Sequence, residues 1–166
     1  MKCKACKASL NLQLIDLGTA PASNAYLSPD KLDEPEQWMP LRVLVCERCW
    51  LVQTQDFIQP EDLFNKDYAY FSSYSSTWLE HAEAYVNEMV VRFSLGTKSC
   101  VVEIAANDGY LLQYVAAHGI RCLGVEPTRS TAKEARAKGL EIREEFFASR
   151  LGSQLWDEGW AADIIV

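Results

Sequence analysis

Apolar residues recur at the spacing of an amphipathic helix between residues 77 and 93. They are Trp78, Leu79, Ala82, Tyr85, Val86, Met89, Val90 and Phe93, and this three-and-four spacing places them on one helical face. Thr77 followed by Glu80 fits the capping box that begins such helices. The pattern therefore predicts a helix over 77–93 that starts at Thr77.

After residue 98 short apolar runs alternate with amphipathic runs. The pattern predicts strands at 100–105, 121–126, 140–145 and 163–166, and helices at 109–118, 129–138 and 148–157. Gly119 and Gly139 have the position of C′ residues behind the first two helices. Strands that alternate with helices indicate a parallel sheet wound right-handedly, so we expect an α/β, Rossmann-like fold.

These changes of pattern divide the chain into three parts: a small domain at 1–60 that includes the strand-like run LRVLVC, an aromatic segment with its linking helix at 61–97, and the sheet at 98–166. The last predicted strand, ADIIV, has no turn or polar tail after it. Strands of a parallel sheet are normally covered on both faces. We therefore expect the chain to be a fragment with a partial sheet that continues beyond Val166.

The cysteines fall into two C-x-x-C pairs and two single residues. They are Cys3 with Cys6, Cys46 with Cys49, and the separate Cys100 and Cys122. Two such pairs can offer four thiolates to one tetrahedral Zn²⁺, which closes its coordination shell and leaves no position for a substrate. We therefore predict a structural zinc site in the domain at 1–60, around which residues 7–45 must fold.

A redox dithiol, or four buried thiols without a metal, is the alternative interpretation of the two pairs. A thioredoxin-type C-x-x-C lies at the end of a βαβ strand, and neither pair has that context. For Cys100 and Cys122 we predict burial as small apolar side chains.

Composition and charge narrow the class of protein. The chain has 166 residues, of which 49% are hydrophobic, and a formal net charge of −7. This acidic balance argues against a nucleic-acid partner, and so against a zinc-ribbon nucleic-acid protein, because such proteins gather Lys and Arg on one face. The sequence has no apolar run of about 18 residues and no signal-peptide pattern. We expect a cytoplasmic monomer with no membrane partner.

The stretch VVEIAANDGYLL, residues 101–112, has the outline of a nucleotide-binding βα turn but holds only one glycine. A dinucleotide fingerprint needs G-x-G-x-x-G so that a pyrophosphate can lie against bare backbone. Here those places hold Ala105, Ala106, Asn107 and Asp108. The missing glycines argue against an NAD-dependent oxidoreductase or epimerase, which is the alternative with the same fold.

Two acidic residues mark the expected ligand edge of the sheet. Glu103 precedes the turn, and Glu126 lies at the tip of the next strand, where an acid can accept both hydroxyls of a ribose. S-adenosylmethionine (SAM) has such a ribose and no phosphate. Asn107 and Asp108 could offer oxygens to its ammonium, and Gly109 could admit close backbone approach. The alternative is a solvated strand end beside an ordinary turn.

Several motifs in order resemble the nucleotide-sugar C-methyltransferases. These motifs are CKAC, DLGTAPASNAYL, PLRVLVCERCWLVQ, LFNKDYAYFSSYSSTWLEHA, VEIAANDGYLLQ, GVEPT and ADIIV, and they cover nearly the whole chain. The family joins an N-terminal zinc-binding domain to a Rossmann-like, class I methyltransferase domain and a C-terminal domain. The resemblance implies a SAM-dependent methyltransferase of deoxysugar biosynthesis with structural Zn²⁺.

In this family the substrate is a nucleoside-diphosphate 4-keto-6-deoxy sugar. A general base removes the acidic C3 proton, and the resulting enolate attacks the SAM methyl group. The resemblance places that base, a histidine with acidic and tyrosine partners, beyond Val166, so we expect the chain alone to be inactive. A zinc module that binds SAM or a nucleotide without catalysis is the alternative.

The resemblance also implies site residues. The cofactor-binding positions are Glu103, Ala105, Asn107, Asp108, Gly109, Glu126 and Pro127. The substrate-binding positions are Tyr68, Tyr70, Ser72 and Ser73, whose segment closes over the active site in the family. Packing between domains is the alternative role of Tyr68 and Tyr70, since aromatic rings usually bury themselves.

Four further side chains, two phenylalanines and two histidines, have less specific expectations. Phe146 and Phe147 could flank adenine or pack in the core. We expect His81 and His118 to be solvated rather than to act as bases.

Overall fold

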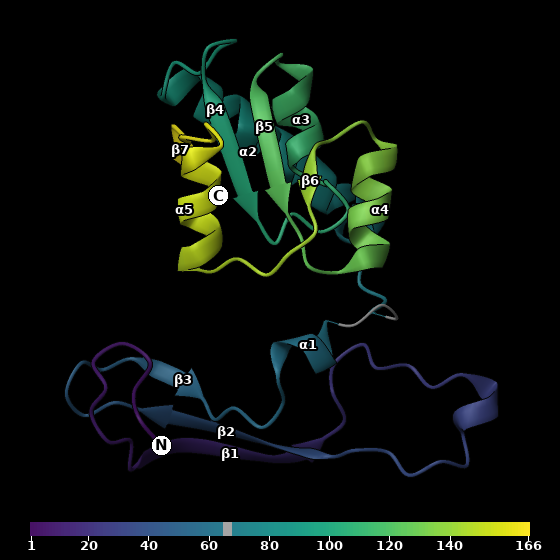
Figure 1. Ribbon diagram of the computed structural model, residues 1–166. Coiled ribbons are helices and arrows are strands. Elements are labelled where there is room, and N and C mark those ends of the chain that lie inside the picture. The colour runs from purple at the N-terminus through teal and green to yellow at the C-terminus, as the bar shows by residue number, and fades with distance from the viewer. Residues whose placement is uncertain (65–67) are drawn as a thin grey trace. The chain divides into compact units, whose positions relative to one another are not determined.

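The computed structural model describes residues 1–64 and 68–166, which form two compact units, Met1–Leu63 and Phe64–Val166 (Figure 1). Residues 65–67 of the LFNKDYAYFSSYSS motif lie outside the described residues. No helix within the two described ranges is both long enough and apolar enough to cross a membrane.

The first unit is built on an antiparallel sheet in the order β1-β2-β3. Its strands are β1 (Leu12–Ala20), β2 (Met39–Val45) and β3 (Val52–Thr54), accompanied by the 3-10 turn η1 (Pro29–Lys31) and the short helix α1 (Pro60–Leu63). The pairing of β1 with β2 shifts register between Gln13 and Ile15. This irregularity coincides with the adjacent apolar pair Leu14 and Ile15, where strict alternation along the strand fails.

The second unit holds a parallel four-stranded sheet in the order β6-β5-β4-β7. The strands are β4 (Cys100–Ile104), β5 (Arg121–Val125), β6 (Ile142–Arg143) and β7 (Ile164–Ile165). The predicted parallel α/β sheet is therefore confirmed. The chain winds outward from β4 to β6 and then returns to the other side of β4, so the strand order reverses beside β4.

The outer strands are shorter than the sequence pattern predicts. The predicted runs 140–145 and 163–166 shrink to two residues each in β6 and β7. Beyond β7, Val166 still accepts a hydrogen bond from the Ile104 N–H and donates one to the Val102 carbonyl, each at 2.9 Å.

Four helices cover the two faces of this sheet, together with the short turn η2 (Ser72–Tyr74). The helices are α2 (Ser76–Arg92), α3 (Leu112–Ala117), α4 (Arg129–Ala137) and α5 (Ser149–Asp157). Figure 1 shows α5 on one face, with α2 and α3 on the other. As predicted, Gly119 and Gly139 follow α3 and α4 with positive φ values of 69° and 83°.

Two predicted helix starts are wrong. The N-cap of α2 is Ser75, whose hydroxyl accepts a hydrogen bond from the Trp78 N–H at 3.2 Å, so the cap lies two residues before Thr77. Helix α3 begins at Leu112 rather than at residue 109. The intervening residues form the turn that follows β4, and their conformation shapes the site described below.

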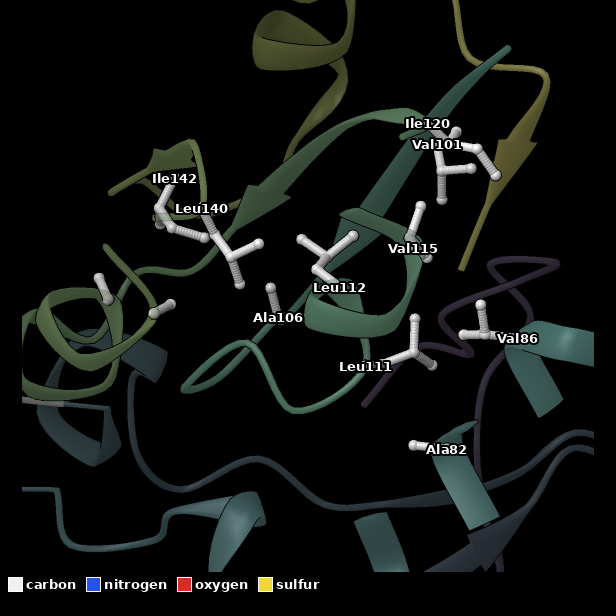
Figure 2. Close-up of a cluster of buried hydrophobic side chains, with 12 residues drawn as sticks. Ala82, Val86, Val101, Ala106, Leu111, Leu112, Val115, Ile120, Leu140 and Ile142 are labelled. Atoms are coloured by element: carbon white, nitrogen blue, oxygen red, sulfur yellow. The ribbon is translucent and has the colours of Figure 1, made fainter. Parts of the chain in front are cut away.

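Alternate residues of β4 belong to two buried clusters. Val101 packs with residues of α2, α3 and α4, and Figure 2 shows it near Val115 and Ile120. Cys100 and Val102 pack on the opposite side with Leu151 and Leu155 of α5. The predicted burial of Cys100 is confirmed, and Cys122 is partly buried against the first cluster.

Candidate functional site

The four cysteines of the two C-x-x-C pairs converge in the first unit, and their sulfur atoms all lie within 4.8 Å of one another. The Sγ atoms are 3.6 Å apart in Cys3 and Cys49, and 3.5 Å apart in Cys6 and Cys46. A tetrahedral Zn²⁺ with bonds of about 2.3 Å to sulfur separates its ligands by roughly 3.8 Å. The cluster therefore fits zinc, and the predicted structural zinc site is confirmed.

The two pairs have the same backbone geometry. In each, the residue after the second cysteine adopts a left-handed conformation, with φ of 62° at Lys7 and 61° at Trp50. Its N–H donates to the carbonyl of the first cysteine, at 3.1 Å for Lys7 to Cys3 and 2.8 Å for Trp50 to Cys46. Hydrogen bonds of backbone N–H groups, led by that of Cys6, lower the pKa of Cys3 to about 6. This shift favours the thiolate that a metal requires.

Gln53 of β3 supports the zinc site from behind, although the sequence pattern alone did not single it out. Its side chain is buried, and its Nε2 donates to the Cys3 Sγ at 3.4 Å. Its Oε1 accepts from the Lys4 N–H at 3.0 Å. The Gln53 side chain thus orients Cys3, a zinc ligand of the first C-x-x-C pair, although Gln53 lies on β3, which follows the second pair.

Replacing Gln53 with Leu is expected to lower zinc affinity by about 10- to 100-fold, because loss of a group that orients a metal ligand has that scale of effect. Competition against a chromophoric chelator measures the change. Gln13→Leu, on the exposed β1 strand of the same unit, is the matched control and should leave zinc affinity unchanged. Equal affinities of the wild type and the Gln53 variant would contradict the supporting role.

In the second unit, the turn after β4 has three residues in the left-handed region, of which only one is glycine. Ala105, Asn107 and Gly109 have φ values of 60°, 50° and 77°. Asn tolerates this left-handed region, but Ala carries a steric cost of about 1–2 kcal/mol there. The alternating conformation therefore does not depend on the missing glycines, and the methyl group of Ala105 and the amide of Asn107 occupy space that glycines would leave open.

The side chains of this turn hold the preceding aromatic segment, residues 68–74. The Asn107 Oδ1 accepts from the Ser72 N–H at 2.9 Å, and its Nδ2 donates to the Tyr70 carbonyl at 3.1 Å. The Asp108 Oδ2 accepts from the Ser73 N–H at 3.2 Å. These contacts use oxygens that the sequence analysis offered to a ligand ammonium. The Asn107 and Asp108 side chains therefore hold residues 68–74 against the turn by hydrogen bonds.

Lys138, directly after α4, adds hydrogen bonds to the turn and to the same aromatic segment. Its ammonium donates to the Ser73 Oγ at 2.8 Å and to the Asp108 carbonyl at 2.6 Å. It also lies 3.6 Å from the Asp108 carboxylate. The aromatic segment is thus held by groups from two separate parts of the sheet domain.

Gly109 has a packing role that the sequence analysis did not predict. A Cβ atom at this position would lie 2.3 Å from the Leu140 Cδ1 and 3.2 Å from the Ala135 Cβ. The glycine is therefore required for packing of the turn against Ala135 of α4 and against Leu140 beyond the helix. Its positive φ adds a second reason for glycine.

Glu126 links the tips of β4 and β5. Its carboxylate is buried, with Oε2 accepting from the Asn107 N–H at 2.9 Å and Oε1 accepting from the Thr128 N–H at 2.8 Å. Each carboxylate oxygen has two lone pairs, so each can accept one further hydrogen bond. The acid is consequently fixed in position before any ligand arrives.

Glu103 lies deeper than the sequence analysis expected. It is only 2% exposed, and its Oε2 has no hydrogen-bond partner among the described residues. Burial raises the pKa of Glu103 to about 8, and the carboxyl groups of Glu126 and Asp108 also raise it. Hydrogen bonds with the Leu112 backbone and the Tyr110 side chain act in the opposite direction.

A pocket opens at the carboxyl ends of β4 and β5, and we call it the strand-end pocket. It encloses about 920 Å³, counting the part open to solvent. Its walls are Phe64, Tyr68, Tyr70, Ser72, Ile104, Ala105, Asn107, Tyr110, Val125, Glu126, Pro127, Thr128, Phe146 and Phe147.

The strand-end pocket gathers most, but not all, of the residues that the sequence analysis assigned to a ligand. Ala105, Asn107, Glu126 and Pro127 line it together with Tyr68, Tyr70 and Ser72. Glu103, Asp108, Gly109 and Ser73 do not line it. Phe146 and Phe147 do line it, whereas Tyr110 and Thr128 belong to its walls without having been expected there.

Comparison with known proteins identifies the first unit and relates the whole chain to an enzyme. Residues 3–64 match the family model Methyltransf_13, which describes a zinc-binding domain. Over 154 residues the chain is 30% identical to the C-methyltransferase NovU of Streptomyces niveus, an alignment that covers 93% of this chain. The chain is therefore similar to a C-methyltransferase over nearly its whole length, and its first 64 residues contain a zinc-binding domain of the Methyltransf_13 type. The resemblance found in the sequence is thereby confirmed.

The chain corresponds to part of that relative, because the alignment spans 36% of the length of NovU. Among solved structures, an RNA methyltransferase from Salinibacter ruber in complex with S-adenosyl-L-homocysteine is 17% identical to this chain. The match covers 45% of this chain and 65% of that one, with a TM-score of 0.34.

Proposed function

We propose that this chain provides the zinc-binding domain and the cofactor-binding part of a SAM-dependent C-methyltransferase. The proposed substrate is a nucleoside-diphosphate 4-keto-6-deoxy sugar, methylated at C3 through an enolate. The match of the zinc-binding domain and the similarity to NovU support the reaction class. The strand-end pocket supports the choice of cofactor.

The observation that carries the proposal is the buried Glu126 carboxylate at the tip of β5, which lines the strand-end pocket. Two backbone N–H groups hold its oxygens in place, and one lone pair on each oxygen remains for the two hydroxyls of a ribose. Phe146 and Phe147 line the same pocket and suit the flat face of an adenine ring.

The charges around the turn favour a cationic ligand over a diphosphate. Asp108 and Glu126 are buried near the turn beside the protonated Glu103, and Lys138 is the cation found beside Asp108 in the described structure. A positive charge near several carboxyl groups stabilises their ionised forms, whereas a diphosphate would add repulsion. The side chains of Ala105 and Asn107 also occupy the positions where a dinucleotide fold has bare glycine backbone.

Each part then has a distinct task. The bound cofactor would supply an electrophilic methyl group. Glu126 would orient its ribose, the turn at 105–107 would orient its amino-acid end, and residues 68–74 would exclude water from above the pocket. The zinc site stabilises the first unit and takes no part in the reaction. We assign removal of the C3 proton to none of the residues of this chain.

Replacing Glu126 with Ala is expected to weaken binding of S-adenosylhomocysteine by about 5- to 150-fold, because hydrogen bonds to a charged group are lost at the ribose, on a scale of about 1–3 kcal/mol. Isothermal titration calorimetry measures the affinity. NAD⁺ in place of S-adenosylhomocysteine should give no binding.

Two controls separate binding from folding. Glu134→Ala removes an exposed acid from α4 and should bind like the wild type. Glu126→Gln removes the charge but retains the shape of the side chain. Circular dichroism establishes that each variant is folded. Unchanged affinity in a folded Glu126→Ala variant, or equal binding of NAD⁺, would overturn the proposed cofactor site.

A further inference from the structure

A second pocket lies in the same unit, against the α2 helix, and we call it the Trp78 pocket. It encloses about 400 Å³, counting the part open to solvent, and is lined by Trp78, His81, Ala82, Tyr85, Tyr110 and Leu111. Tyr110 also lines the strand-end pocket. A single aromatic residue therefore belongs to the walls of both pockets.

Three rings form a continuous stack along this wall. Trp78 stacks on His81 with ring centroids 5.2 Å apart and on Tyr110 with centroids 5.9 Å apart, at interplanar angles of 22° and 29°. His81, which the sequence analysis expected to be merely solvated, is exposed but has a defined place against Trp78.

Two buried residues form the floor of the Trp78 pocket. Ala82 and Leu111 are buried members of the main core cluster, and Figure 2 shows them on facing segments of α2 and of the turn before α3. The small side chain of Ala82 leaves room above the floor, while Trp78 remains 42% exposed at the rim. A ligand could enter without displacing core residues.

The lining chemistry suits an uncharged ring. Neither Lys nor Arg is among the residues that line the Trp78 pocket, so nothing there would balance a phosphate. Its aromatic rings offer apolar faces, and the indole N–H, the imidazole nitrogens and the tyrosine hydroxyls offer hydrogen bonds at their edges. Such a combination binds a cyclic molecule that has apolar C–H faces and polar groups around its rim.

We propose that the Trp78 pocket binds the sugar ring of the methyl acceptor, with Trp78 as its stacking surface and His81 as a hydrogen-bonding group. This inference rests on the proposed function, because it takes the strand-end pocket to hold the methyl donor. Methyl transfer requires the donor and acceptor atoms to approach to about 3–3.5 Å. A pocket that shares the Tyr110 wall with the donor pocket is placed to provide this proximity.

The test follows the Trp78 indole N–H and the Ala82 methyl signals by NMR, with saturating S-adenosylhomocysteine present. UDP-glucose is the probe, and UDP is the control that lacks the sugar. We expect UDP-glucose to shift both signals and UDP to leave them unmoved. Trp78→Leu should weaken this binding by about 2- to 10-fold, the scale of a lost aromatic contact. Trp156→Leu alters an exposed ring on α5 and should have no effect.

The outcomes distinguish this inference from the cofactor proposal. Shifts near Phe146 and Asn107 on adding S-adenosylhomocysteine report on the strand-end pocket. If these occur while UDP-glucose leaves Trp78 and Ala82 unmoved, or UDP moves them equally, the acceptor site is wrong and the cofactor site stands. If they do not occur, the cofactor proposal fails, and the UDP-glucose titration repeated without the cofactor still decides whether the Trp78 pocket binds the sugar.

Discussion

Replacing Cys46 with Ser is expected to release zinc and unfold the unit Met1–Leu63. The buried apolar cluster of this unit consists of Cys3, Leu10, Leu44 and Cys46, so half of its members are metal ligands. Structural zinc contributes about 10–16 kcal/mol of apparent binding free energy in small zinc domains. Few buried side chains remain to offset that loss, and most of β1 is exposed.

Zinc content by elemental analysis and the NMR signals of the first unit measure this effect. Cys122→Ser is the matched control, since it makes the same chemical change in the second unit, outside the cysteine cluster. It should retain one zinc per chain. A Cys46→Ser variant that keeps both its zinc and the dispersed signals of β1 and β2 would show that the four-cysteine site does not hold the first unit together.

Replacing Glu103 with Gln is expected to remove a pH dependence from the stability of the second unit. Burial raises the pKa of Glu103 from an ordinary value near 4.5 to about 8. Between these values the folded state binds one more proton than the unfolded state, so stability is full below pH 4.5 and falls as pH rises toward 8. One proton corresponds to a slope of about 1.4 kcal/mol per pH unit.

The amide introduced by Glu103→Gln resembles the protonated acid, so the variant should equal the wild type near pH 5 and exceed its stability at pH 8. Urea unfolding followed by circular dichroism, repeated between pH 5 and 9, measures the difference. Glu141→Gln removes an exposed carboxylate and controls for the loss of one negative charge. Parallel pH curves for the wild type and the Glu103 variant would contradict a protonated Glu103.

The zinc site could be predicted from the sequence because its determinants are local. Each C-x-x-C pair sets the geometry of its own loop, and the left-handed residues Lys7 and Trp50 follow the same pattern in both loops. Only the meeting of the two loops depends on the fold. Gln53 could not be predicted in the same way, because it supports Cys3 from 50 positions away along the chain.

The strand-end turn was only partly predictable because its partners are remote. The parallel sheet brings Glu126 beside the turn, as the alternating pattern indicated. No local signal showed that Asn107 and Asp108 would hold Ser72 and Ser73, 35 positions earlier. The packing of Gly109 against Leu140 is equally non-local, so no local sequence signal revealed it.

The zinc site also has a consequence for how the length of the first unit can vary. The metal joins two short loops and closes the chain between them, residues 7–45, into a ring. The entropy of closing such a ring rises only logarithmically, by about 0.6 kcal/mol for each doubling of length. No residue of 21–38 is buried, so insertions in that stretch would meet no core side chain. A metal cross-link of this kind lets the connection between β1 and β2 change in length while both cysteine pairs keep their geometry.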